Sequence, residues 1–173
     1  MLVRGLQING LALLGALLLV LVSNQRLAES TKWSLCDKDK IEANVSNLIV
    51  SDCETLNETC PFNRGFNKSI ELDFTPNKQI ESVKVKIAGK LSRLPIPWSV
   101  KPDEACGNYG FECPLEPNKA YKFKLTVPVL RTYPQLNVNV FLRLVDEADN
   151  VLACVEIPAR IQEPKKEETA AAH

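Results

Sequence analysis

The most constraining segment of this chain is Leu94-Pro95-Ile96-Pro97-Trp98-Ser99-Val100. In an extended segment successive side chains alternate between two sides, so the four apolar residues of this stretch form one row. The two prolines fix φ and remove backbone donors, which excludes a central strand. Such a row either closes a core at its edge or lines an apolar opening. We expect the second, with Trp98 at the mouth of a pocket, and the first is the alternative.

Alternating apolar and polar residues predict strands in much of the remaining chain, and no segment with a helical period competes with them. Several strands joined by turn residues are typical of an all-β sandwich with two antiparallel sheets. A second segment bracketed by prolines, residues 128–134, carries Val129 and Tyr133. Proline-rich edges on both sides allow the sheets to separate and leave an apolar pocket, whereas most sandwiches have filled cores. The expected strands are residues 41–50, 70–75, 83–87, 121–127, 136–144 and 151–161.

The chain begins with the pattern of a secretory signal peptide. Arg4 supplies a positive charge, and an apolar run too short to span a bilayer comfortably follows at residues 11–22. We therefore expect residues 1–28 to be a signal peptide, with cleavage between residues 23 and 28, and residues 29–163 to form one domain. The charged residues 164–173 are expected to be a disordered tail. The expected location is extracellular, or the lysosome lumen.

The six cysteines form an even set, which in a secreted chain indicates three disulfides. Six cysteines allow 15 pairings, and spacing favours two short loops and one long bridge between the chain ends. Neither short gap has zinc-finger spacing, so we expect no metal site. The favoured pairs are Cys53–Cys60, Cys106–Cys113 and Cys36–Cys154. Three sequons predict glycosylation at Asn44, Asn57 and Asn67.

Charge and residue types exclude several classes of function. The chain has 21 basic and 21 acidic residues, so it lacks the basic excess that binding to nucleic acid requires. Its single histidine is His173 in the tail, and the cysteines are assigned to disulfides, so no Ser-His or Cys-His pair can form in the domain. No glycine-rich phosphate loop is present. We therefore expect neither an enzyme nor a cofactor-binding protein.

The residues themselves resemble a known family. Several short motifs and their order carry the resemblance: the six-cysteine order, the Leu94–Trp98 motif followed by Cys106, the pairs Cys113-Pro114 and Tyr133-Pro134, and the sequence Cys-Val-Glu-Ile-Pro from Cys154. In these motifs the chain resembles the ML-domain lipid-recognition family. The similarity is greatest to its soluble Niemann–Pick type C cholesterol carriers and covers about residues 33–162. It implies an immunoglobulin-like β-sandwich that binds a sterol or related lipid between its sheets, in a tunnel that expands when filled.

The resemblance also implies which residues contact lipid. Trp98 stands where the family has a phenylalanine at the pocket mouth, and Ile96 stands where it has a lining valine. Val129 and Tyr133 match a lining valine and a tyrosine of the family. The expected function is binding and transfer of a sterol or other hydrophobic lipid by a monomer, through transient contact with a membrane or a membrane-bound sterol transporter. The alternatives are innate-immune recognition of microbial lipids such as lipopolysaccharide, and a filled-core adhesion module.

Overall fold

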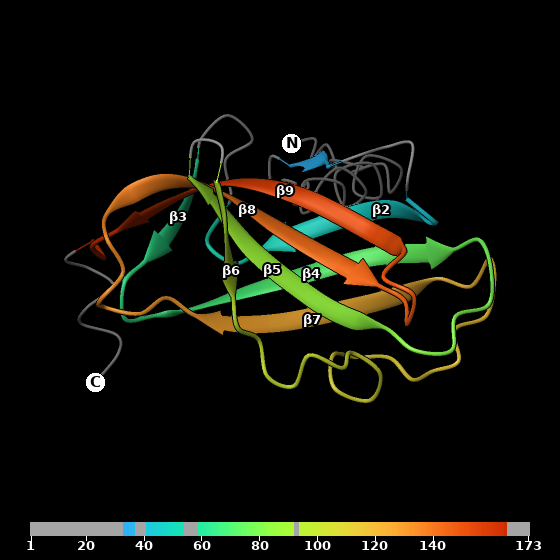
Figure 1. The fold of residues 1–173 in the computed structure, drawn as a ribbon. Helices are drawn as coiled ribbons and strands as arrows, with labels where there is room; N and C mark the ends of the chain where they lie inside the picture. The colour runs from blue at the N-terminus through green and yellow to red at the C-terminus, as the bar shows by residue number, and fades with distance from the viewer. Residues whose placement is uncertain (1–32, 37–40, 54–58, 92–93, 166–173) are drawn as a thin grey trace, which may run out of the picture.

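The structure is a computed structural model that describes residues 33–36, 41–53, 59–91 and 94–165. This part of the chain forms nine strands and no helix (Figure 1). The strands are β1 (Ser34–Leu35), β2 (Ala43–Val50), β3 (Cys60–Asn63), β4 (Asn67–Pro76), β5 (Lys84–Leu91), β6 (Leu94–Trp98), β7 (Tyr121–Pro128), β8 (Leu136–Val145) and β9 (Val151–Gln162).

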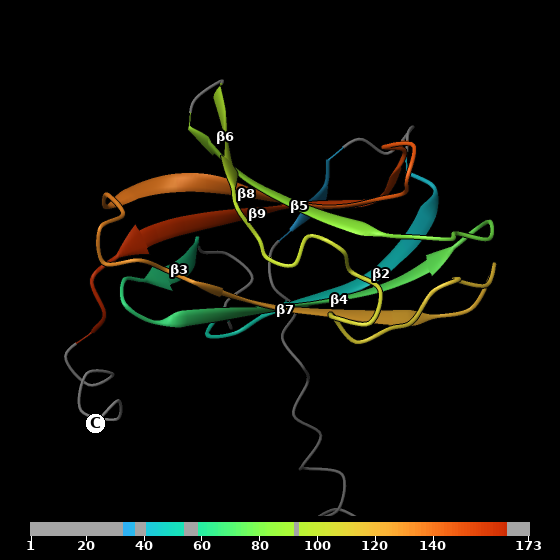
Figure 2. The ribbon, with the colours of Figure 1, turned by 60° about the horizontal axis from the view of Figure 1, so that its bottom comes forward.

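The strands form two sheets that face each other as a sandwich, which confirms the predicted fold class (Figure 2). The larger sheet has the order β1-β9-β8-β5-β6, with β3 also paired to β9, and the smaller sheet has the order β2-β4-β7. The pairings are antiparallel except that of β3 with β9, which is parallel. β1 and β3 were not predicted, because segments of two and four residues are too short to show an alternating pattern.

The core lies between the sheets and is built from the inward-facing residues of each strand. In β4 and β7 every second residue is buried, as the alternation predicts. Bulky side chains fill the space between the sheets, and each contributes about 1.5–3 kcal/mol by leaving water. The fully buried examples include Leu72 and Phe74 on β4, Phe123 on β7, and Leu142 and Leu144 on β8.

Three disulfides have the pairing that the cysteine spacing favours: Cys36–Cys154, Cys53–Cys60 and Cys106–Cys113. The first fastens β1 to β9 near the two ends of the domain. Asn44 and Asn67 are exposed on β2 and β4, whereas the sequon at Asn57 lies outside the described residues. The expected signal peptide and residues 166–173 of the tail also lie outside them.

Two kinds of feature are absent from the described residues. No helix among them is long and apolar enough to cross a membrane. No group of three or more histidine, cysteine, aspartate or glutamate side chains among them could hold a metal ion.

The two long edges of the sandwich differ, and this difference positions the site. At one edge the residue just before β2 is bonded to β9, because Glu42 N donates to Val151 O, 3.0 Å. At the other edge β6 pairs only with β5 and, with the end of β5, rises away from the sandwich (Figure 2). The segment after β6 runs across to β7, where Lys124 N donates to Tyr109 O, 2.8 Å. The edge between β6 and β7 is therefore closed by a loop rather than by strand pairing.

Candidate functional site

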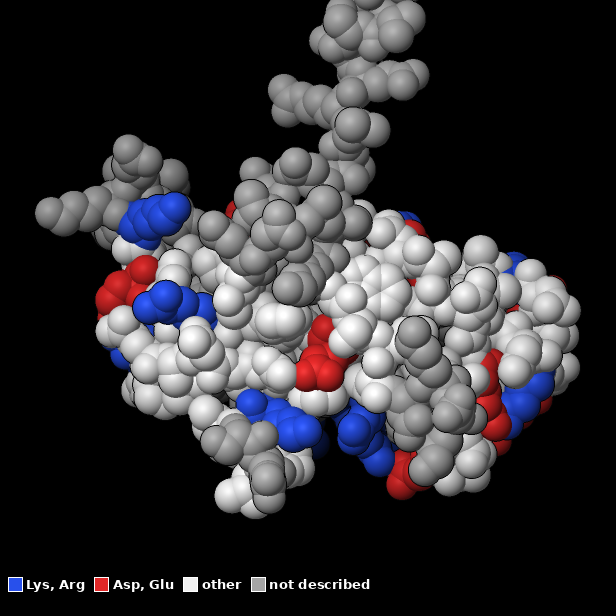
Figure 3. Space-filling model, turned by 90° about the horizontal axis from the view of Figure 1, so that it is seen from above, with Lys and Arg blue, Asp and Glu red and all other residues white. Residues whose placement is uncertain are grey.

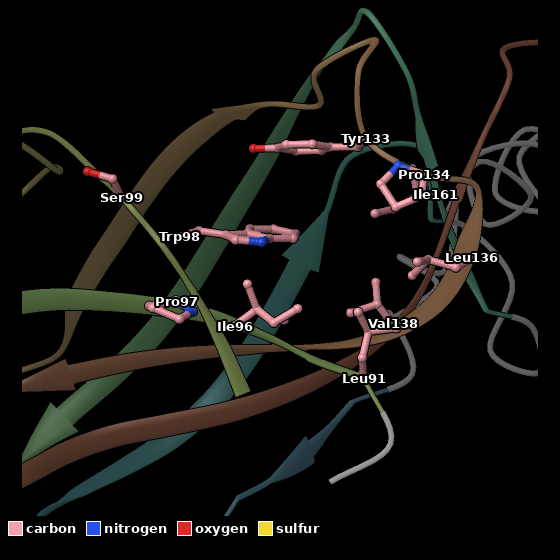
Figure 4. Close-up of a pocket in the computed structure, with 11 residues that line it drawn as sticks. Leu91, Ile96, Pro97, Trp98, Ser99, Tyr133, Pro134, Leu136, Val138 and Ile161 are labelled. Atoms are coloured by element: carbon pink, nitrogen blue, oxygen red, sulfur yellow. The ribbon is translucent and has the colours of Figure 1, made fainter. Parts of the chain in front are cut away.

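A pocket of about 340 Å³ lies where β6 rises from the larger sheet (Figure 4). Its wall consists mainly of aliphatic and aromatic side chains from β5, β6, β8, β9 and the end of the segment between β7 and β8. A concave, mostly apolar site of this size fits the lower range of small-molecule pockets. The lining residues are Gly89, Leu91, Ile96, Pro97, Trp98, Ser99, Tyr133, Pro134, Leu136, Val138 and Ile161.

Two aromatic rings stack at this pocket. The centroids of Trp98 and Tyr133 are 6.0 Å apart and the ring planes differ by 20°, and Figure 4 shows the rings lying one above the other. Trp98 comes from β6, where the prolines hold the strand extended. Tyr133 is placed by a tight turn in which its N–H donates to Leu130 O, 3.1 Å. Strand β6 and the segment that follows β7 thus meet through this aromatic pair.

Gly89 on β5 permits the close approach of the indole. It pairs with Ile96 of β6 and with Val140 of β8. A Cβ atom at position 89 would lie 3.0 Å from Val138 Cγ2 and 3.4 Å from Trp98 Cζ2. A side chain here would enter the wall of the pocket. A glycine inside a strand often marks a close approach of this kind. The expected strand ended at residue 87, before Gly89, whereas β5 continues to Leu91, so the sequence did not single this residue out.

Three of the four residues expected to contact lipid come together here: Ile96, Trp98 and Tyr133 all line the pocket. Val129 does not line it. Val129 is buried, with 4% of its surface exposed, and its N–H donates to Phe66 O, 2.9 Å. It continues the inward-facing series of β7 beyond the end of the strand. Leu94, which shares the apolar row of β6, is 73% exposed and lies outside the pocket lining.

The pocket lies to one side of the larger sheet and takes none of its lining from β2, β4 or β7. A second hollow of about 220 Å³ adjoins it, because Ser99 lines both. This second hollow does reach the smaller sheet, since Leu125 and Val127 of β7 contribute to its lining. The two hollows together follow the edge between β6 and β7.

Few ionisable groups line the site. Tyr133 is the only titratable side chain among the lining residues of the first pocket. At the second hollow, Tyr109 donates its hydroxyl to Pro102 O, 2.6 Å, and burial together with the nearby Asp103 raises the pKa of Tyr109 above its usual value. On the face shown in Figure 3, Lys, Arg, Asp and Glu side chains are scattered over a surface of mostly uncharged residues. The arrangement can therefore hold an apolar molecule, mainly by burial.

Comparisons with known proteins agree with this geometry. A family model described as the ML domain matches residues 30–161. The chain is 33% identical to the NPC intracellular cholesterol transporter 2 homolog a of Drosophila melanogaster, over 68% of this chain and 79% of that protein. It is 29% identical to NPC intracellular cholesterol transporter 2 of Bos taurus, over 85% and 95% of the two chains.

A solved structure agrees as well. The crystal structure of a Niemann–Pick type C2 protein from the Japanese carpenter ant superposes with a TM-score of 0.71 at 27% identity, and the match covers 75% of this chain and 98% of that one. Since the family model spans most of the domain and the fold is shared, this chain belongs to the ML-domain family.

Proposed function

We propose that this protein binds one sterol-like lipid in the pocket beside Trp98 and Tyr133 and releases it to a membrane or a membrane-bound sterol transporter. The observation that carries the proposal is the apolar pocket itself, with the stacked rings of Trp98 and Tyr133 in its lining. The relatives named as cholesterol transporters support the same class of ligand. The mechanism is burial of hydrocarbon and not a reaction.

Burial alone supplies enough free energy for useful affinity. Removing about 500 Å² of apolar ligand surface from water contributes roughly 12 kcal/mol before the costs of association and ordering. The polar end of the ligand is then placed near Trp98 and Tyr133, whose indole N–H and phenol O–H can hydrogen-bond to a hydroxyl group.

The bound state extends further than the hollow of about 340 Å³. The ligand enters beside the aromatic pair and continues along the edge between β6 and β7, toward the inward-facing residues Leu125 and Val127. This path requires the two sheets to move apart at that edge, where no strand pairing joins them among the described residues. Val129, buried at the end of β7, then forms part of the ligand wall.

The proposed site of action is outside the cell or in the lysosome lumen. The support is the pattern of a signal peptide in residues 1–28 together with the three disulfides, which persist in oxidising compartments. The carrier acts as a monomer.

A titration of the purified protein with a fluorescent sterol tests the proposal, with lipopolysaccharide and a fatty acid as competitors. Saturable binding of one sterol per chain, displaced by unlabelled sterol, is the expected result. Displacement by lipopolysaccharide but not by sterol would favour recognition of microbial lipid. The absence of any lipid, both in this assay and in native mass spectra of protein secreted from its own tissue, would favour a filled-core adhesion module.

A further inference from the structure

We propose that Arg64 is a positioning residue that holds Tyr133 against Trp98 and thereby sets the rate at which lipid enters and leaves. The inference rests on the proposed function and adds to it a residue that lies outside the pocket lining. Arg64 is in the turn between β3 and β4, far from Tyr133 in the sequence but next to it in the fold.

The guanidinium of Arg64 joins two segments. Its Nη1 donates to the carbonyl oxygen of Tyr133, 2.9 Å. Its Nη2 forms an ion pair with the carboxylate of Glu163, just after β9. The backbone of Arg64 is held as well, since its N–H donates to Gln162 O, 2.9 Å. The side chain is only 21% exposed, so the bond to the Tyr133 carbonyl is largely shielded from water.

The same turn holds the other end of the segment that carries the tyrosine. Gly65 N donates to Val129 O, 2.6 Å, and Val129 N donates to Phe66 O, 2.9 Å. Gly65 has a φ of +84°, and a Cβ atom there would lie 2.9 Å from Arg131 Nε, so the Arg131 side chain lies directly over it. The segment 129–133 is therefore fastened at both ends, by Gly65 and Phe66 at the start and by Arg64 at the end.

Because of these contacts, the backbone of Tyr133 is held more firmly than that of Trp98. Trp98 belongs to an edge strand that pairs only with β5, whereas Tyr133 is fixed through its own carbonyl. Moving the backbone of Tyr133 away from the indole requires the bond from Arg64 to lengthen or break, so that rotation about its own side-chain bonds is the motion left to the ring. Hydrogen bonds from a charged donor are the stronger class, whereas an exposed ion pair such as that with the 57%-exposed Glu163 contributes little by itself. The role of Glu163 is thus to orient the guanidinium.

The experiment measures the motion of Trp98 and the kinetics of lipid exchange separately. In a Trp33→Phe background, Trp98 is the only tryptophan of the chain, and its quenching by acrylamide reports access to the indole. Stopped-flow mixing with a fluorescent sterol gives the association and dissociation rates. The variants are Arg64→Ala and Arg64→Lys, with Arg160→Ala as a control that removes the same charge from an exposed position on β9.

For Arg64→Ala we expect both rates to rise roughly tenfold, with the dissociation constant within threefold of the parent, and quenching of Trp98 to increase. Arg64→Lys is expected to restore part of the effect, and Arg160→Ala to behave as the parent. If Arg64→Ala does not fold, Glu163→Gln is expected to raise both rates about threefold. Rates within twofold of the parent together with unchanged quenching would overturn the assignment. If the parent protein binds no sterol, the proposed function fails. Unchanged quenching of Trp98 in Arg64→Ala or Glu163→Gln would separately refute the role of Arg64 in holding Tyr133 against Trp98.

Discussion

Replacing Gly89 by alanine narrows the pocket at a known point. The new Cβ would lie 3.0 Å from Val138 Cγ2 and 3.4 Å from Trp98 Cζ2. The first distance is shorter than an ordinary contact between carbons, so the valine must shift by a few tenths of an ångström. The methyl group stands in the wall of a hollow of about 340 Å³ and takes space from any ligand there.

The magnitude of the effect follows from the size of the change. One methylene in an apolar pocket alters affinity by roughly 1–3 kcal/mol, or about 10–200-fold. Overpacking lowers the free energy of unfolding by about 1–3 kcal/mol. Alanine also restricts the unfolded chain more than glycine does, which raises the free energy of unfolding by about 0.4–1 kcal/mol. We therefore expect Gly89→Ala to fold, to lose roughly 1–2 kcal/mol of stability, and to bind sterol at least tenfold more weakly.

The assay is a fluorescent-sterol titration alongside urea unfolding. The control is Ala88→Val, because residue 88 of the same strand points to the opposite face of the sheet. Sterol binding by Ala88→Val should remain close to that of the parent protein. If Gly89→Ala binds sterol within twofold of the parent, the ligand does not occupy this pocket and the reasoning is refuted.

Three further outcomes are expected. Trp98→Ala removes a stacking partner worth about 0.5–1.5 kcal/mol beyond its buried area, so the dissociation constant for sterol should rise roughly tenfold. An unchanged dissociation constant would argue against contact between the sterol and Trp98. Val129→Phe should fold but abolish saturable binding if the ligand reaches the end of β7, and binding at parental affinity would limit the ligand to the outer hollow. Burial by itself raises the pKa of Asp146, but hydrogen bonds from the turn residues and a nearby lysine outweigh it and lower that pKa. The stability that Asp146 contributes is therefore fully present well above the ordinary pKa of an aspartate and is lost as the pH falls through its lowered pKa. The free energy of unfolding should then not change through Asp146 between pH 7 and 5. Asp146→Ala is expected to lose about 2 kcal/mol of stability by calorimetry at pH 7, and a different pH dependence of this variant between pH 7 and 5 would contradict the reasoning.

The longer strands could be predicted because each buries one face. In β4, β7 and β8 the alternation is nearly unbroken, and the bounds differ from the expected ones by only a few residues. β1 and β3 could not be predicted, since their pairing with β9 is a tertiary contact without a local pattern. At β1 the disulfide of Cys36 to Cys154 of β9 supports the pairing, whereas the disulfide of Cys60 at β3 goes to Cys53 and not to β9.

Part of the site could also be predicted. The proline spacing identified Ile96 and Trp98 as edge residues, and the structure places both at the pocket. The apolar row of β6 did not predict that Leu94 is solvent-exposed. Periodicity assigns a side chain to one face of a strand but does not say how deeply it is buried. Gly89 and Arg64 could not be assigned from sequence, since one acts through the absence of a side chain and the other through a distant backbone carbonyl.

Photo-crosslinking with a diazirine sterol, followed by peptide mass spectrometry, tests the central claim most directly. The account predicts one sterol per chain, with crosslinks to the peptides that carry Ile96–Trp98 and Tyr133–Val138, competed by unlabelled sterol and reduced in Gly89→Ala. Crosslinks confined to other surfaces, or labelling at these peptides that unlabelled sterol does not compete, would contradict it.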